Sequence, residues 1–238
     1  GSTGHTAAVD LPRPPVPPRV DVTDSDIAIF TATDGTSFQV ETVVIGLEVP
    51  WSLDFASDGR LFVTERTGRV RVVVNGELLS EPALTLEDVY AVGEAGLLGL
   101  ALDPEFAHNG FVYVFYTQHR PGAAPSNRIV RYREVGNVMA EAVTLLDDLP
   151  AATVRAGGRL RFGPDGLLYV TMGDMLDAGA AQDFASSTGT ILRIRPDGTT
   201  PEGNPFLSPV YSVGHRNSQG LAWHPLTGTL WATEHGHL

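Results

Sequence analysis

The sequence predicts an all-β fold, a β-propeller of four-stranded antiparallel blades, and two observations support this prediction. A hairpin-like unit recurs along the 238-residue chain, and its starting leucines lie at positions 53, 100, 160 and 221. The resulting spacings of 47, 60 and 61 residues agree with repeats of four strands each. The 26 Gly and 17 Pro residues favour many turns and few long helices. A β-sandwich with accidental similarity among its hairpins is the alternative interpretation.

Each repeat begins as a β-hairpin, in which a short strand of alternating apolar residues leads through a glycine-containing turn into a second strand. The two clearest copies are residues 53–64 and 160–171, each with an Asp-Gly turn. Looser copies at 100–115 and 221–233 turn at Asn-Gly and Thr-Gly. Glycine suits these turns because it adopts positive φ angles without steric cost. We expect one recurring aromatic residue of each second strand to pack between neighbouring sheets: Phe62, Tyr113, Tyr169 and Trp231.

Further strands are predicted after the first three hairpins. Third strands are expected at 69–74, 128–133 and 190–195, and fourth strands at 82–85, 142–146 and 209–213. Residues 38–45 have the pattern of one more outer strand, placed before the first hairpin, whereas the last repeat holds two strands. Residues 38–238 are therefore predicted to form a partial propeller of about three and a half blades.

The N-terminal region, residues 1–37, is predicted to be an irregular, Pro-rich leader. Five prolines fall within seven residues: Pro12, Pro14, Pro15, Pro17 and Pro18. Such a density favours an extended, polyproline-like tether. The stretch is typical of the mature start of an exported protein, so we expect an extracellular or periplasmic location. An arm packed on the surface of the domain is the alternative.

Charge and residue content exclude several classes of function. The formal net charge of −12 argues against a nucleic-acid partner and against docking on an anionic membrane, because both need clusters of basic residues. The chain contains no Cys, which excludes disulfides, thiolate catalysis and cysteine–zinc sites. No apolar run in the sequence reaches the roughly 18 residues that a membrane span needs.

Short motifs follow one another in a fixed order from about residue 43 to the C-terminus. They are Val49-Pro50-Trp51, Thr64-Glu65-Arg66, Gly96-Leu97-Leu98-Gly99-Leu100-Ala101, Gly157-Gly158-Arg159-Leu160, Gly173-Asp174, Gly214-His215-Arg216-Asn217 and Glu234-His235-Gly236. No single motif is specific, but the ordered set resembles the soluble PQQ-dependent aldose sugar dehydrogenases, the glucose/sorbosone dehydrogenase family. The resemblance implies a six-bladed propeller, of which this chain looks like an N-terminal fragment. The open propeller edge of such a fragment predicts self-association.

The resemblance also implies an activity and its cofactors. The family oxidises the anomeric carbon of aldoses to lactones and passes a hydride to PQQ, which calcium holds over the central channel. Arg216 and Asn217 match the pair that contacts PQQ, and a guanidinium offers permanently charged donors to this planar polyanion; a structural Arg that pins the loop is the alternative. Gly236 matches a position whose carbonyl binds calcium, although His237 replaces the Pro that usually follows. Glu94 falls where some members place a Gln near the cofactor.

At the catalytic position the sequence departs from the family pattern. Asp174 matches the acid that assists a catalytic His, and a turn-capping Asp is the alternative. The family places that His two residues before the Gly157-Gly158 pair, where this chain has Arg155. A general base must accept a proton, whereas a guanidinium stays protonated and has no acceptor site. The sequence therefore predicts that aldose oxidation is impaired.

Other functions fit part of these observations. A non-catalytic propeller would bind a sugar or a protein ligand in its central channel. A calcium-dependent lactone hydrolase shares the six-bladed architecture by analogy of fold alone, and the Gly-His-Arg-Asn motif argues against it. A zinc site is disfavoured, because His235 and His237 alternate as on a strand but no third ligand, His215 included, has the spacing of a zinc motif.

Overall fold

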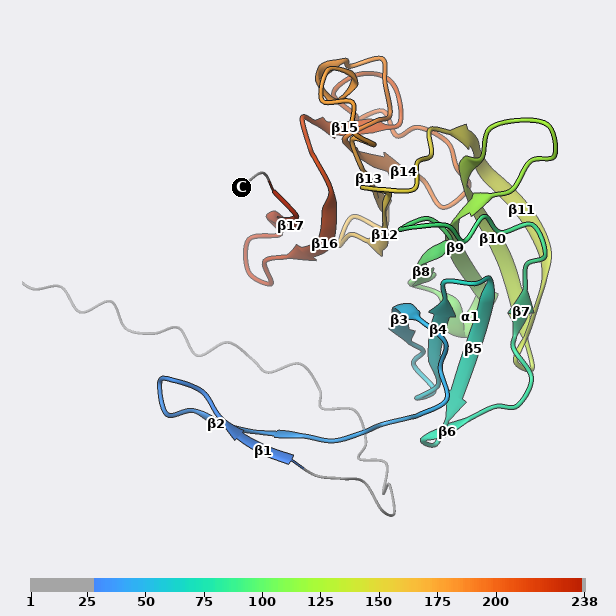
Figure 1. The fold of residues 1–238 in the computed structure, drawn as a ribbon, viewed down its shortest axis with the longest axis vertical. Helices are drawn as coiled ribbons and strands as arrows, with labels where there is room; N and C mark the ends of the chain where they lie inside the picture. The colour runs from blue at the N-terminus through green and yellow to red at the C-terminus, as the bar shows by residue number, and fades with distance from the viewer. Residues whose placement is uncertain (1–27, 237–238) are drawn as a thin grey trace, which may run out of the picture.

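The computed structural model describes residues 28–236, and nearly all of its regular structure is antiparallel β-strand. Four sheets stand side by side in an arc, and a separate two-stranded hairpin precedes them (Figure 1). Among the described residues, helical structure is limited to one short turn of α-helix, α1 (Phe106–Asn109), and one 3-10 turn, η1 (Ala180–Gln182). The prediction of an all-β propeller with four-stranded antiparallel blades is confirmed.

The first sheet has a divided outer edge. Its strands are β3 (Pro50–Phe55), β4 (Leu61–Glu65), β5 (Arg69–Val74), β6 (Glu77–Leu78) and β7 (Leu84–Thr85). Both short strands pair with β5. Strand β6 pairs with the C-terminal end of β5 at Val73–Val74, and β7 pairs with the N-terminal end of β5 at Arg69–Val70. The fourth strand predicted at 82–85 is therefore only one half of this edge.

The second and third sheets each consist of four strands in simple sequential order. The second sheet contains β8 (Leu97–Leu102), β9 (Phe111–Gln118), β10 (Ser126–Val135) and β11 (Val138–Leu149). The third contains β12 (Gly157–Phe162), β13 (Leu168–Met172), β14 (Thr190–Ile194) and β15 (Val210–Val213). The fourth sheet is the hairpin of β16 (Ser218–Trp223) and β17 (Leu230–Glu234). The predicted third strands are confirmed, and β11 is longer than the strand expected at 142–146.

The first strands of the four sheets lie next to one another in sequence order. β3 contacts β8, β8 contacts β12, and β12 contacts β16, so these four strands line the inner side of the arc (Figure 1). This radial arrangement places every sheet face to face with its neighbours, as in a propeller.

Aromatic side chains fill the space between sheets, as the repeat pattern predicted for three of the four residues. Phe62 is fully buried, and Tyr113 meets Phe162 of the next sheet edge to face, with ring centroids 5.1 Å apart. Tyr169 meets Trp223 in the same way at 5.0 Å. The prediction is wrong for Trp231, which is 64% exposed, because no further sheet covers β17 among the described residues.

The segment before the first sheet also differs from the prediction. β1 (Ala28–Thr31) and β2 (Ser37–Val40) pair with each other as a hairpin and with no blade. The prediction of irregular structure is thus wrong for 28–31, and the outer strand expected at 38–45 is wrong as well; residues 1–27 lie outside the described part. A local turn at 32–36 allows the two β-prone segments to pair with each other. Residues 44 and 47 pack instead on the outer face of the first sheet, against Leu61 and Val63.

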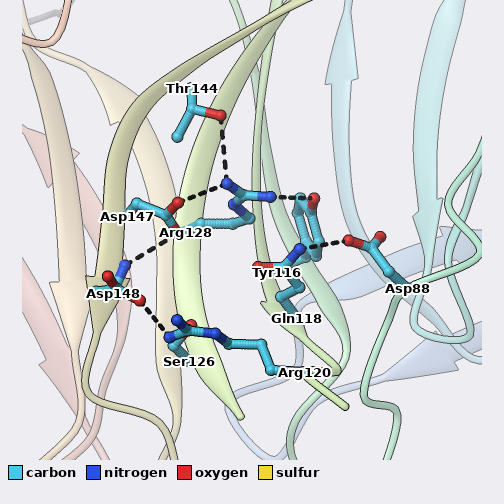
Figure 2. A network of polar contacts seen from close by, with 9 residues as sticks. All are labelled: Asp88, Tyr116, Gln118, Arg120, Ser126, Arg128, Thr144, Asp147 and Asp148. Carbon is cyan, nitrogen blue, oxygen red and sulfur yellow. Dashed lines mark hydrogen bonds and ion pairs between the residues drawn. The ribbon is translucent and has the colours of Figure 1, made fainter. Parts of the chain in front are cut away.

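A network of polar side chains holds the outer strands of the second sheet together (Figure 2). The Arg128 guanidinium on β10 contacts Asp147 on β11 at 2.6 Å and the Tyr116 hydroxyl on β9 at 3.5 Å. Gln118 donates to Asp88 at 2.7 Å, which fixes the loop that enters this sheet. The network is structural, since it lies on the outer strands and away from the inner strands. In the part of the chain that the model describes, no helix is long and apolar enough to cross a membrane.

Gly99 is predicted to be essential for the packing of β8 against β12. A Cβ at this position would overlap the Gly158 carbonyl oxygen and lie 2.9 Å from the Leu160 nitrogen, and both are backbone atoms that cannot turn aside. Gly99→Ala should lower the free energy of unfolding by about 1–3 kcal/mol, the usual cost of overpacking. Urea denaturation measures the change. Gly179→Ala is the control, because that Cβ would meet only the Asp177 carboxylate at 3.3 Å; equal effects would contradict the prediction.

Candidate functional site

The antiparallel pairing within each sheet brings the start of its first strand beside the end of its second strand. In the third sheet Gly157 pairs with Met172, and in the fourth Ser218 pairs with Glu234. Five loops therefore lie together at one end of the central axis. They are the loops before β8, β12 and β16 and the loops after β13 and β17. Five of the six site residues predicted from the sequence lie in these loops and are connected by hydrogen bonds: Glu94, Arg155, Asp174, Arg216 and Asn217.

An ion pair between Arg155 and Asp174 lies at the centre of this cluster. The Nη1 atom of Arg155 donates to both carboxylate oxygens of Asp174, at 2.9 and 3.2 Å. The Asp174 side chain is only 4% exposed and the Arg155 side chain 26% exposed, so the pair is largely buried but opens to solvent on the arginine side. The Arg155 backbone has a φ of 51°, and its N–H donates to Glu94 Oε2 at 2.7 Å.

Asp174 connects the Arg155 segment to the Arg216 segment. Its Oδ1 accepts a hydrogen bond from Leu176 N at 3.0 Å, which closes the turn after β13. Its own backbone N–H donates to the Arg216 carbonyl at 2.7 Å. Asp174 therefore caps this turn, which was the alternative weighed from the sequence, and the same carboxylate also pairs with Arg155. Because the Asp174 carboxylate already accepts hydrogen bonds from Arg155 and Leu176, it has little capacity to accept another one.

Arg216 and Asn217 are held from opposite sides. Arg216 Nη1 donates to the His235 carbonyl at 2.6 Å, while its Nε is buried without a hydrogen-bond partner among the described residues. The Asn217 Oδ1 accepts from Gly157 N at 3.2 Å and from Gln219 Nε2 at 2.9 Å. No carboxylate side chain contacts the Arg216 guanidinium in the described part of the chain, so its positive charge is not neutralised locally.

Two residues that sequence reasoning missed complete the site. Glu234 accepts hydrogen bonds from Arg216 N, from His215 at 3.0 Å and from Ser218 at 2.9 Å. Partial burial raises the pKa of Glu234, but these hydrogen bonds outweigh it and lower the pKa below its usual range. The sequence signal was its place in the Glu234-His235-Gly236 motif, whose first residue carries no family role in the resemblance.

Arg159 is the second residue that was missed, and it lies on the inner side of the arc. Its Nε donates to the Gln219 carbonyl at 2.8 Å and its Nη1 to Ser52 Oγ at 3.1 Å, and its guanidinium lies 4.4 Å from the Trp51 ring centre. It thus bridges the first, third and fourth sheets. Desolvation, and then the charge of Arg161, lower the pKa of this guanidinium.

Gly236 is exposed and follows the cluster directly. Among residues 28–236, no group of three or more His, Asp or Glu side chains lies close enough together to hold a metal ion. His215 is bound to Ser212 and Glu234, while His237 lies outside the described residues. The cluster is therefore a polar site of arginines, carboxylates and amides.

The fold and this cluster define a β-propeller protein with a polar site of hydrogen-bonded arginines and carboxylates at one end of its central axis. The family model of the glucose/sorbosone dehydrogenases matches residues 47–238, and the chain belongs to this family. The family is one of PQQ-dependent sugar dehydrogenases, and its solved structures include relatives of this chain.

Three relatives show the extent of the similarity. An oxidoreductase of Thermus thermophilus described as a glucose dehydrogenase is 44% identical, with a TM-score of 0.77 over 88% of this chain and 61% of that chain. The PQQ-bound aldose sugar dehydrogenase of Streptomyces coelicolor is 35% identical, with a TM-score of 0.75 over 93% of this chain and 63% of that chain. Quinoprotein glucose dehydrogenase B of Acinetobacter calcoaceticus is 30% identical over 87% of this chain and 50% of its own length. The chain spans about half the length of the curated relatives it matches.

The Arg155–Asp174 pair is predicted to stabilise the fold, because Asp174 would otherwise be a buried charge without a partner. Arg155→Met should lower the free energy of unfolding by about 2–4 kcal/mol, slightly less than the usual 3–5 for a fully buried pair, since Arg155 is partly exposed. Adding Asp174→Asn should recover part of this loss, as a double-mutant cycle in urea would measure. Arg133→Met is the control, because its pair with Glu141 is exposed and should cost less than about 1 kcal/mol. Equal losses at Arg155 and Arg133 would contradict the prediction.

Proposed function

We propose that this chain forms the cofactor-binding side of a PQQ-dependent sugar dehydrogenase site, and that it oxidises aldoses poorly. The observation that supports the second half is the ion pair between Arg155 and Asp174, which occupies the position of the family's catalytic base. The aldose substrate class follows from the family and from relatives described as aldose sugar and glucose dehydrogenases. An extracellular or periplasmic location is proposed with it and is supported by the Pro-rich N-terminal stretch.

The residues around Arg216 fit a planar, anionic cofactor. Among the described residues, the Arg216 guanidinium keeps a buried Nε donor without a partner and forms no ion pair with a carboxylate. Such a group favours the carboxylates and carbonyl oxygens of PQQ, because guanidinium donors form charge-assisted hydrogen bonds with them. Asn217 is fixed through its Oδ1, which leaves its Nδ2 donor without a partner among the described residues. PQQ, when bound, supplies the hydride acceptor, and Arg216 and Asn217 would hold and orient it.

At the position of the family's base, the chain offers no acceptor for the proton of the anomeric hydroxyl. Arg155 stays protonated, and Asp174 already accepts from Arg155 Nη1 and Leu176 N. Glu94 is occupied in part by the Arg155 backbone N–H. A sugar bound beside Arg155 would therefore be oriented by hydrogen bonds but would keep its proton, and this limits the reaction at the step that needs a base.

The described residues do not complete a calcium site. Calcium binds six to eight oxygen ligands, and the cluster offers the exposed Gly236 carbonyl together with carboxylates that are already hydrogen-bonded elsewhere. Calcium is therefore implied by the family resemblance alone, and no step of the proposed chemistry depends on calcium.

Restoring the base should restore activity. Arg155→His would place a proton acceptor beside Asp174, so we expect dye-linked oxidation of glucose and other aldoses, with PQQ and calcium added, to rise about 100-fold or more. Arg155→Lys is the control, because it keeps the charge and offers no acceptor at neutral pH. Rapid turnover by the unmodified chain would contradict the proposal. If Arg155→His binds PQQ and remains inactive, a non-catalytic propeller is the better description.

PQQ binding should depend on Arg216. Arg216→Ala removes the guanidinium that carries the uncompensated charge, and we expect the dissociation constant for PQQ to rise about tenfold or more, as for the loss of a hydrogen bond to a charged group. Titration followed by PQQ absorbance measures the change. Arg133→Ala, on an outer strand, should leave the affinity unchanged. Tight binding that survives Arg216→Ala would show that the cofactor is held elsewhere.

A further inference from the structure

Glu234, at the end of β17, contacts three residues of the loop that carries Arg216. Its Oε1 accepts a hydrogen bond from the Arg216 backbone N–H. Its Oε2 accepts from His215 Nδ1 at 3.0 Å and from Ser218 Oγ at 2.9 Å. The side chain is 28% exposed, so the contacts form at the mouth of the cluster and not in the core. One carboxylate thus fixes the loop on both sides of Arg216.

The contacts of Glu234 extend to the third sheet through His215. The Nε2 atom of His215 lies 2.8 Å from Ser212 Oγ on β15, while its Nδ1 faces Glu234. Since the carboxylate can only accept, His215 donates from Nδ1 to Glu234, while its Nε2 forms the hydrogen bond with the Ser212 hydroxyl. The arrangement therefore joins the fourth sheet to the outer strand of the third across the Arg216 loop.

The next residue, His235, holds the same loop with its backbone. The His235 carbonyl accepts from Arg216 Nη1 at 2.6 Å, and the His235 N–H donates to the Asn217 carbonyl at 3.1 Å. Glu234 fixes the Arg216 main chain, and His235 fixes its guanidinium. Together they hold an otherwise flexible side chain in one conformation before any ligand binds.

We propose that Glu234 is a positioning residue for the anion-binding Arg216, an inference that rests on the proposed function. A preorganised guanidinium loses less conformational freedom on binding than a mobile one, so its hydrogen bonds contribute more to affinity. A free carboxylate at this place would repel an anionic cofactor. Here the negative charge is directed into three donors of the loop, and Glu234 acts through Arg216 without itself being a ligand.

Amide hydrogen exchange of the cofactor-free chain tests the inference without PQQ. Glu234→Gln replaces one acceptor oxygen with a donor facing His215 and Ser218, so exchange across residues 214–218 should become about tenfold faster. Glu234→Asp keeps the charge but shortens the reach, and it should give the same result if position, and not charge, matters. Thr233→Ala, exposed on the same strand, is the matched control. Unchanged exchange in both Glu234 variants would overturn the inference.

PQQ titration at neutral pH forms the second arm. We expect the dissociation constant to rise about tenfold for Glu234→Gln and to stay constant for Thr233→Ala. If exchange in the loop accelerates while PQQ affinity stays at the level of the unmodified chain, Glu234 does not position Arg216 for the cofactor and the inference fails. If the unmodified chain does not bind PQQ, the proposed function fails, whereas the exchange experiment still decides whether Glu234 orders the loop. Melting temperatures show whether the variants remain folded.

Discussion

Close approach between the innermost strands of neighbouring sheets is the constraint on which both the fold and the site depend. Glycine makes it possible, because a Cβ at Gly99 would overlap the backbone of β12; within the third sheet, a Cβ at Gly173 would likewise overlap the Arg155 carbonyl. Interiors packed to this density do not yield to an added methyl group. Approach of the third and fourth sheets lets the Asp174 N–H donate to the Arg216 carbonyl, while pairing of β12 with β13 inside the third sheet lets Arg155 reach Asp174. The site therefore depends on packing between sheets and on pairing within one of them.

Repetition made much of the fold predictable from the sequence. The leucine spacing and the turn glycines give three blades and a hairpin, because each repeat has to bury the same kind of face. The failures occur where a segment has no neighbouring sheet to decide its role. Residues 28–40 pair with each other, and Trp231 stays exposed, although its pattern is that of a core residue. Local sequence patterns show which residues suit a strand or a core. Whether such a residue pairs or becomes buried depends on whether a neighbouring sheet is present.

Only those residues of the candidate site that lie in recognisable sequence motifs could be predicted. Family resemblance pointed to Arg155, Asp174, Arg216 and Asn217; in the structure Asp174 bonds to both Arg155 and Arg216, and Asn217 bonds to Gly157 beside them. The partners that hold them were not predictable, because Glu234 and Arg159 act through main-chain atoms and neutral groups that leave no pattern in the sequence.

Arg155 stands where the family resemblance implies a His, and the two side chains differ in whether they can transfer a proton. Asp174 is nearly enclosed, so the position beside it must hold a hydrogen-bond donor, and Arg and His both meet that structural demand. The two residues differ in proton transfer, because a His can release and accept a proton near neutral pH whereas an Arg stays charged. Under the proposed function, Arg155 therefore meets the structural requirement beside Asp174 but not the chemical requirement for a general base. The hydrogen bond to the buried carboxylate is kept, while the group that donates it has no site to accept a proton from a substrate.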